Sequence, residues 1–329
     1  METESRSSSR RDALLKLLRV GGVSTAAAGL AGWLSSRSKR PEEALGAVLK
    51  PDYLIAPDLA LPEMTVARGG EPETLTRRAI QAIGGISRFV ARGDVVVVKP
   101  NIAWDRTPEQ AANTNPQVVA EIVRLSLEAG AKKVIVTDVS CNEPRRCFER
   151  SGIAAAARAA GAEVLLPEER RFREVDLRGE VLRTWPVLDQ FLNADKMINV
   201  PIAKHHSLTE CTLGMKNWYG ILGGSRHRLH QHIQETLVDL ADFMRPTLTV
   251  MDAYRVLLRN GPQGGNVSDT VLKKTIIAST DPVALDAYVA KAFWDLETNR
   301  LPYLLMAQDR GLGKVDFKSA RTSVITSDG

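Results

Sequence analysis

The chain has 329 residues, of which 44% are hydrophobic and 25% are charged, a balance that allows a sizeable buried core. Its formal net charge of +5 lies in the first 40 residues, where eight Lys/Arg stand against three Asp/Glu, so the remainder carries 36 basic and 36 acidic residues. A neutral body with 5% aromatic residues excludes a disordered chain and a bundle of membrane helices, and predicts no binding to nucleic acid.

Residues 1–46 are predicted to be a leader and linker. Ser9–Lys16 is basic and is followed by an uncharged Ala/Gly-rich run, Val20–Leu34. The start resembles a twin-arginine signal, with Ala13 in the place of the usual Phe. The resemblance implies export of the folded protein by the twin-arginine machinery to the periplasm. If the leader is not removed after Ala44–Gly46, it would anchor the protein on the outer side of the cytoplasmic membrane, its only expected membrane contact; an ordinary amphipathic helix is the alternative.

The three cysteines, Cys141, Cys147 and Cys211, are too few for a disulfide scaffold. No two of them have the Cys-x-x-Cys spacing, so we expect no iron-sulfur cluster from this chain alone. In an oxidising compartment Cys141 and Cys147 could pair. Cys211 is then left as a small buried residue or a ligand.

In the first half of the chain, apolar runs alternate with helical patterns. The predicted elements, in order, are a helix at Glu73–Phe89, a strand at Asp94–Asn101, a helix at Pro116–Ala129, a strand at Lys133–Asp138, a helix at Phe148–Ala160 and a strand at Ala162–Glu168. Such alternation builds a mostly parallel sheet with helices on both faces, because continuous apolar strands must be covered on both sides.

The second half continues this pattern. Its predicted strands are Lys196–His206, Leu248–Tyr254 and Thr275–Pro282, and its predicted helices are Ile233–Met244, Pro282–Trp294 and Leu301–Arg310. Residues 47–329 are therefore expected to form an α/β domain, either as one unit or as two lobes that divide near residues 185–196 around one cleft.

Polar residues end most of the predicted strands, and parallel sheets bind ligands beyond the carboxyl ends of their strands. These residues are Lys99, Asn101, Asp138, Lys204, His205, His206, Asp252, Thr280 and Asp281, the last predicted to cap a helix. The sequence has no G-x-G-x-x-G after the first strand, no P-loop and no G-x-S-x-G. These absences argue against dinucleotide dehydrogenases, nucleotide triphosphatases and serine hydrolases.

All five histidines lie between His205 and His232, which predicts a site that holds a metal or moves protons. In an extended segment His205 and His206 point to opposite faces, so we expect only His206 in the site. The arginine-containing loop that carries the other three histidines could instead bind an anion. The glycine-rich Asn260–Gly265 is expected to be a loop that approaches the site, or a simple turn.

The segments VVVVKPNIAW, VIVTDVS, INVPIAKHHSLTECTLGMKNWYGILGG, HRLHQH, TVMDAY and STDPVALDAY resemble the family called domain of unknown function 362. The resemblance spans Asp94–Val289. Its most specific residues are Lys204, His206, Gly214, Lys216, Asn217 and His230 or His232. Many relatives carry a ferredoxin-like cysteine segment that this sequence lacks, so an electron-transfer role is not carried over.

The order of His206, Lys216 and His230 or His232 is also similar to that in the nickel-pincer lactate racemases. That resemblance implies that His206 transfers a proton, that Lys216 holds a nicotinic-acid-derived cofactor and that His230 or His232 binds the metal. The chemistry is compatible, since a lysine can hold an anionic cofactor and a histidine can bind a metal or accept a proton.

Together these patterns predict an exported enzyme that performs metal- or organic-cofactor-dependent proton transfer on a small anionic substrate. The predicted catalytic residues are His206, Lys204 and Lys216. The predicted cofactor-binding residues are Lys99, Asn101, Lys216, Asn217 and Asp138. The predicted ligands of a metal, which could be nickel, zinc or iron, are His230, His232 and Asp252. The alternative is a non-catalytic periplasmic protein that holds an anionic ligand or a metal for another component.

Overall fold

The computed structural model describes residues 52–326. The predicted leader lies outside the described residues, and the predicted division into lobes near residues 185–196 stays a prediction. None of the helices in the described part of the chain combines the length and apolar character needed to span a bilayer.

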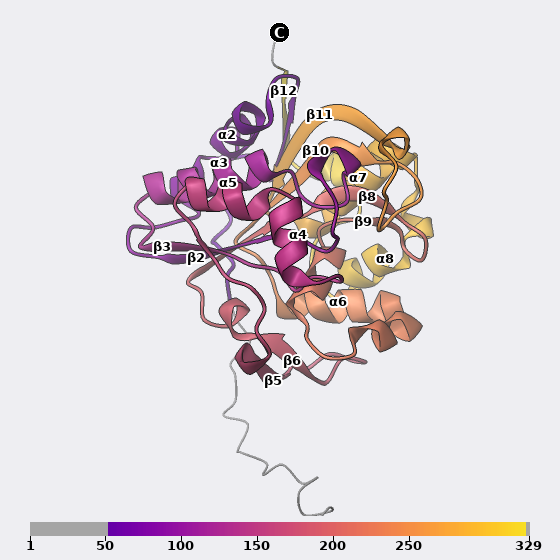
Figure 1. The fold of residues 1–329 in the computed structure, drawn as a ribbon. Helices are drawn as coiled ribbons and strands as arrows, with labels where there is room; N and C mark the ends of the chain where they lie inside the picture. The colour runs from indigo at the N-terminus through magenta and orange to yellow at the C-terminus, as the bar shows by residue number, and fades with distance from the viewer. Residues whose placement is uncertain (1–51, 327–329) are drawn as a thin grey trace, which may run out of the picture. The chain divides into compact units, whose positions relative to one another are not determined.

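A ten-stranded sheet forms the centre of the described residues (Figure 1). Its strands are β1 (Met64–Arg68), β2 (Val95–Pro100), β3 (Lys133–Val136), β4 (Glu163–Val164), β7 (Lys196–Val200), β8 (Ile202–His206), β9 (Glu210–Thr212), β10 (Leu248–Leu257), β11 (Thr270–Ser279) and β12 (Thr322–Thr326). The strand order is β12-β1-β11-β10-β7-β2-β3-β4, and β8 pairs with β10 and β9.

Most strand pairs in this sheet are parallel. Strands β7, β2, β3 and β4 run parallel to one another, as do β7 and β8 with β10. Only β11, which lies between β1 and β10, and the short β9 pair in the antiparallel sense within the described sheet. The predicted fold class, a mostly parallel α/β sheet, is therefore confirmed.

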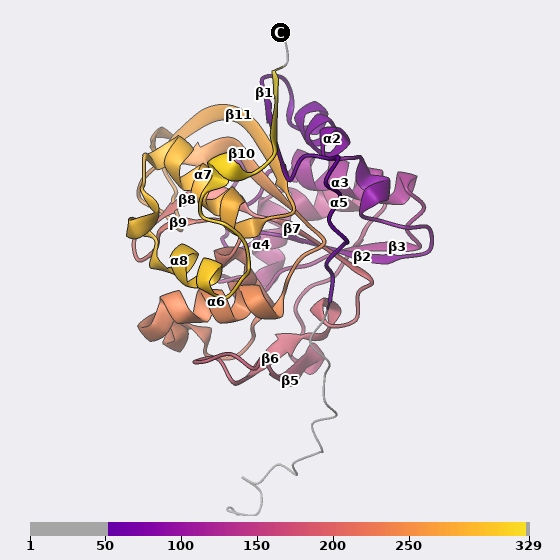
Figure 2. The same ribbon diagram turned by 180° about the vertical axis from the view of Figure 1, so that it is seen from behind.

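Helices cover both faces of the sheet (Figures 1 and 2). One face carries α2 (Pro72–Ala82), α3 (Pro116–Glu128), α4 (Pro144–Arg150) and α5 (Ile153–Ala159), and the other carries α6 (Ile233–Phe243), α7 (Pro282–Trp294) and α8 (Pro302–Asp309). Strand β2 shows why its sequence is continuously apolar: Val96 and Val98 pack into the core on the first face, and Val97 packs into the core on the second.

Three predicted elements are shorter or divided, each for a backbone reason. The helix predicted to reach Phe89 ends at Ala82, because Gly84 and Gly85 have positive φ angles. The helix predicted over Phe148–Ala160 is split into α4 and α5 at Gly152, which is also left-handed, with φ of 73°. Between β7 and β8, Pro201 divides the long predicted strand.

The predicted strand at Ala162–Glu168 was largely wrong, because only β4 pairs with the edge of the sheet. The sequence also missed β1 and β12, and the separate hairpin-like sheet of β5 (Phe172–Asp176) and β6 (Thr184–Leu188). These strands are five residues or shorter and contain polar residues, so they lack the long apolar run that marks the central strands.

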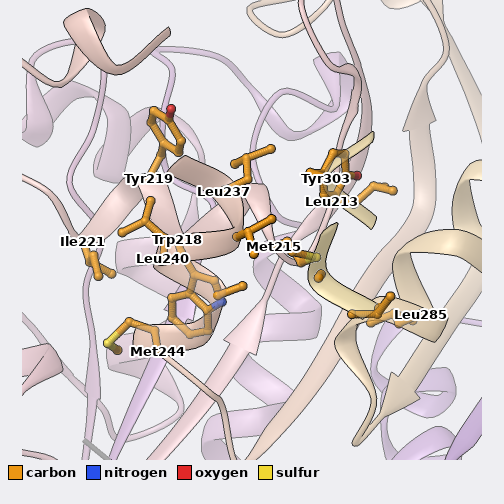
Figure 3. Close-up of a cluster of buried hydrophobic side chains, with 14 of the residues drawn as sticks. Leu213, Met215, Trp218, Tyr219, Ile221, Leu237, Leu240, Met244, Leu285 and Tyr303 are labelled. Carbon is orange, nitrogen blue, oxygen red and sulfur yellow. The ribbon is translucent and has the colours of Figure 1, made fainter. Parts of the chain in front are cut away.

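A large apolar core lies beneath the segment that follows β9 (Figure 3). Trp218 is 1% exposed and packs in one cluster with Leu213 and Met215 of its own segment and with Leu237 of α6. Apolar contacts of Trp218 with this core therefore hold the helix η5 (Lys216–Ile221) in position. This matters for function because η5 begins at one of the predicted site residues.

We expect Leu237→Ala to lower the free energy of unfolding by about 2–5 kcal/mol, because Leu237 is fully buried and its truncation leaves a cavity beneath η5. The control is Leu305→Ala on α8, whose side chain is 38% exposed, and which should cost much less. Urea unfolding of the two variants measures the difference. Equal losses would contradict the assignment of this core.

Candidate functional site

A cleft of about 580 Å³ lies at the carboxyl ends of β2, β3 and β8. The segment that contains η5 and η6 (Arg226–His232) forms its other side. Eight of the predicted site residues line it: Lys99, Asn101, Asp138, Lys204, His206, Lys216, Asn217 and His230. Arg226 and His227 also line it, whereas His232 and Asp252 do not.

The carboxylate of this cleft is Asp138, and it is already paired. Lys99 Nζ lies 2.6 Å from Asp138 Oδ1, and the backbone N–H of Ile102 donates to Asp138 Oδ2 at 2.6 Å. Burial lowers the pKa of Lys99, and the negative charge of Asp138 opposes that shift. A side chain at Gly220 would not fit beside this pair, since an added Cβ would lie 2.0 Å from Asp138 Oδ1.

Amide groups hold this pair in place. Asn217 Oδ1 accepts from Asn101 Nδ2 at 3.0 Å and from Lys99 Nζ at 3.2 Å. Asn217 Nδ2 donates in turn to Asn199 Oδ1 at 2.8 Å. These side chains satisfy one another, so Lys99, Asn101, Asp138 and Asn217 form a rigid polar floor.

Lys204 extends this network without a carboxylate of its own. Its Nζ donates to Asn101 Oδ1 at 2.9 Å and to the carbonyl oxygen of Ala112 at 2.6 Å. Burial lowers the pKa of Lys204 to about 7. Two of the three ammonium protons are thus engaged, and the third position remains for another group in the cleft.

Lys216 differs from Lys99 and Lys204, the other lysines of the cleft, because within residues 52–326 no acceptor or carboxylate contacts its Nζ. The side chain is only 7% exposed, and its Nζ lies 4.6 Å from the centre of the Tyr219 ring. Burial lowers the pKa of Lys216 to about 8. At neutral pH this residue is therefore a buried cation that faces the cleft without a counter-ion in the described structure.

Asp286 of α7 positions the start of η5, a role that was not predicted from the sequence. Its two carboxyl oxygens accept from the backbone N–H groups of Gly214 at 2.7 Å and Met215 at 2.9 Å, directly before Lys216. The residue is fully buried, and burial raises its pKa to about 7. A charged residue within the otherwise apolar first turns of α7 was the available signal.

His206 and His205 lie on opposite sides of β8. His206 is 6% exposed and lines the cleft, and its Nδ1 accepts from the backbone N–H of Leu208 at 3.1 Å. This contact assigns the ring proton to Nε2. Burial, with the charges of Lys216 and Lys204, lowers the pKa of His206 to about 2, so the imidazole is neutral at physiological pH.

His205 instead contacts the glycine-rich loop. Its Nδ1 accepts from the backbone N–H of Gly261 at 3.1 Å, and a Cβ on Gly261 would lie 2.0 Å from the His205 carbonyl oxygen. The loop therefore needs glycine for this close approach. The next residue, Pro262, lines the cleft, so the Asn260–Gly265 loop does lie beside it.

The three predicted metal ligands do not converge. His230 lines the cleft, with its Nδ1 2.9 Å from the His227 carbonyl oxygen, whereas His232 is exposed at the end of η6. Asp252 lies on β10 beside a second, smaller cleft of about 310 Å³, where it accepts from the backbone N–H groups of Asn115 at 2.7 Å and Tyr254 at 2.9 Å.

The separation has a simple cause: Asp252 serves the start of α3, and the short turns of η6 place His230 and His232 on different sides. Nowhere among the described residues do three His, Cys, Asp or Glu side chains form a group that could hold a metal ion. The donor set of the described cleft therefore does not fit a metal held by three protein ligands.

The disulfide that Cys141 and Cys147 could form in an oxidising compartment is not present in the structure. All three cysteines are free, with Cys147 and Cys211 buried and Cys141 exposed in the cleft. Arg226 Nη2 donates to the Ser140 carbonyl oxygen at 2.7 Å and to Cys141 Sγ at 3.4 Å. This arginine joins η6 to the loop after β3, a contact that no sequence spacing indicates.

We expect Asp286 to make the free energy of unfolding fall as the pH rises from 3.8 to about 7. The folded state retains a proton on Asp286 up to a pH of about 7, whereas an ordinary carboxyl has a pKa of 3.8, so unfolding releases that proton between the two values. Asp286→Asn should remove this contribution and flatten the decline. Urea unfolding at several pH values tests it, with Asp309→Asn on the exposed end of α8 as control. Parallel curves for wild type and Asp286→Asn would contradict it.

Two solved structures are only loosely similar to this chain. A protein of Thermotoga maritima gives 11% identity and a TM-score of 0.37, covering 73% of this chain and 60% of the other. The lactate racemase apoprotein of Thermoanaerobacterium thermosaccharolyticum gives 10% identity and a TM-score of 0.41, covering 73% and 58%. The chain thus spans about three fifths of their length, and overlaps at this level do not establish a shared function.

Sequence comparison is more informative. A thylakoid-associated protein of Synechocystis is 27% identical over 245 residues, which cover 72% of this chain and 74% of the relative. The profile of the family described as Domain of unknown function (DUF362) matches residues 96–291, a range that contains every residue lining the cleft. The chain therefore belongs to the domain of unknown function 362 family.

Proposed function

We propose that the protein is an enzyme that binds a small anionic substrate in this cleft and transfers a proton to or from it. The observation that carries the proposal is Lys216, a buried ammonium group with no counter-ion among the described residues. A buried charge is costly unless it is paired. Because Asp138 is already paired with Lys99, an anionic ligand would supply the missing negative charge.

Lys204 is the group best suited to move the proton. Its pKa of about 7 lets it hold or release a proton near neutral pH, as an acid-base catalyst requires. Asn101 and the Ala112 carbonyl oxygen fix its position. His206 is the residue that the sequence predicts for this step, but a neutral imidazole with a pKa of about 2 is better suited to donate its Nε2–H to a substrate oxygen.

The proposed enzyme could also depend on a cofactor, but the site limits which residues would contact it. Lys99, Asn101, Asp138 and Asn217 bind one another, so an anionic organic cofactor would contact Lys216 first. A metal would need ligands beyond the protein, because His230 is the only one of the three predicted ligands that lines the described cleft.

The test is anion binding and its dependence on Lys216. Calorimetric titration with oxalate, at constant ionic strength, should show binding that weakens about tenfold or more in Lys216→Met, since a charge-assisted contact is lost. In wild type, affinity should also fall as pH rises past about 8, where Lys216 loses its charge. His232→Ala, outside the cleft, is the control. Equal oxalate affinity in wild type and Lys216→Met would refute the proposal.

Proton transfer is tested separately from binding. A panel of small 2-hydroxy acids in deuterium oxide, followed by proton NMR, should reveal a substrate whose carbon-bound proton exchanges. Lys204→Met should abolish that exchange while oxalate still binds. Oxalate binding without exchange on any member of the panel would instead support the non-catalytic anion-holding protein.

We also propose that residues 1–46 direct the protein out of the cytoplasm. The proposal is based on the paired Arg10 and Arg11 ahead of the apolar run. Replacing both by lysine should leave the full-length chain in the cytoplasmic fraction, because the twin-arginine route reads the pair. Cell fractionation with an antibody to the mature domain measures this. Unchanged export of the double-lysine variant would contradict the proposal.

A further inference from the structure

Cys141 is the exposed thiol of a chain with three cysteines, and it lies in the cleft. The other two, Cys147 and Cys211, are buried, and burial raises the pKa of Cys147 to about 11. Cys141 is also held in place. Its backbone N–H donates to the Ala103 carbonyl oxygen at 2.8 Å, and Arg226 donates to its sulfur at 3.4 Å. A structural cysteine would be buried, so this placement calls for another role.

The groups around the thiol provide an independent reason to expect a ligand here. Lys216 lines the same cleft, is more than nine-tenths buried and lacks an acceptor within residues 52–326. Burial lowers the pKa of Lys216, and the negative charge of a Cys141 thiolate opposes that shift, so the two groups share one electrostatic environment. The same opposition holds for Lys204.

We propose that Cys141 is a nucleophile that adds reversibly to the carbonyl carbon of an anionic aldehyde or 2-oxo acid bound in the cleft. This inference rests on the proposed function for the anion site and names the substrate class. The carboxylate of such a ligand pairs with Lys216 and Arg226, which places its carbonyl group beside the sulfur.

The addition needs no oxidant or reductant. A bond forms between Cys141 Sγ and the carbonyl carbon, and the π electron pair moves to the carbonyl oxygen. That oxygen takes a proton from the Lys204 ammonium, and the resulting amine takes the proton released by the thiol, so that Lys216 keeps its charge beside the carboxylate. The product is a hemithioacetal, or a hemithioketal from a 2-oxo acid, that keeps the negative charge of its carboxylate, and the reverse sequence releases the ligand unchanged.

The first experiment compares alkylation of the native full-length chain by iodoacetate and by iodoacetamide. Mass spectrometry should place the label on Cys141, and the rate ratio of anionic to neutral reagent should exceed that of free cysteine by about tenfold or more, because a cationic cleft concentrates anions. Lys216→Met should collapse the ratio. Arg228→Gln, an exposed arginine of η6 that does not line the cleft, should leave it unchanged.

The second experiment detects the adduct itself with glyoxylate labelled with carbon-13 at its aldehyde carbon. Wild type should show a hemithioacetal resonance that Cys141→Ser lacks, and after cyanoborohydride treatment mass spectrometry should find no adduct on the cleft lysines Lys204 and Lys216. An adduct on either cleft lysine, or the same spectrum in wild type and Cys141→Ser, would overturn the proposal.

The alkylation ratio tests the anion site, and the carbon-13 spectrum tests Cys141 as a nucleophile. Charge-selective alkylation without a hemithioacetal would refute the nucleophile and leave the anion site standing. A ratio equal to that of free cysteine would refute the anion site, and with it the substrate class proposed for Cys141.

Discussion

One carboxylate and three lysines share the cleft, and the rest of the site depends on that imbalance. Asp138 neutralises Lys99, so Lys204 has only neutral partners and Lys216 has a tyrosine ring. Keeping an ammonium group out of water without a counter-ion costs several kcal/mol. The site therefore contains an unpaired positive charge. A bound anion would compensate this charge, and without an anion the rest of the fold must offset its energetic cost.

Contacts around the segment that carries Lys216 hold this unpaired charge in place. Asp286 holds the two N–H groups that precede Lys216, and Trp218 anchors the same segment in the apolar core. Gly220 lets the chain pass close to the Lys99–Asp138 pair. These supporting groups are themselves unfavourable in isolation, since Asp286 is a fully buried acid. Such local conflicts are expected where function, rather than stability, determines the sequence.

The floor of the site could be predicted from the sequence because parallel strands bring their carboxyl ends to one edge. Lys99, Asp138 and Lys204 each follow an apolar run, and that topology placed them together. Distinguishing His230 from His232 required the geometry of a short irregular helix, which has no hydrophobic period to read. The role of Asp286 and the contact between Arg226 and Cys141 depend on tertiary packing over 71 and 85 residues of separation. No local pattern encodes contacts of that kind.

The most direct test of the central claim is the ionisation of Lys216 itself. Lysine side chains labelled with nitrogen-15 and carbon-13 can be titrated by NMR, with Lys216→Met to assign the resonance. We predict that Lys216 has a pKa of about 8, and that adding oxalate raises this pKa because the anion stabilises the ammonium form. A Lys216 resonance that titrates like an exposed lysine and does not respond to oxalate would contradict it.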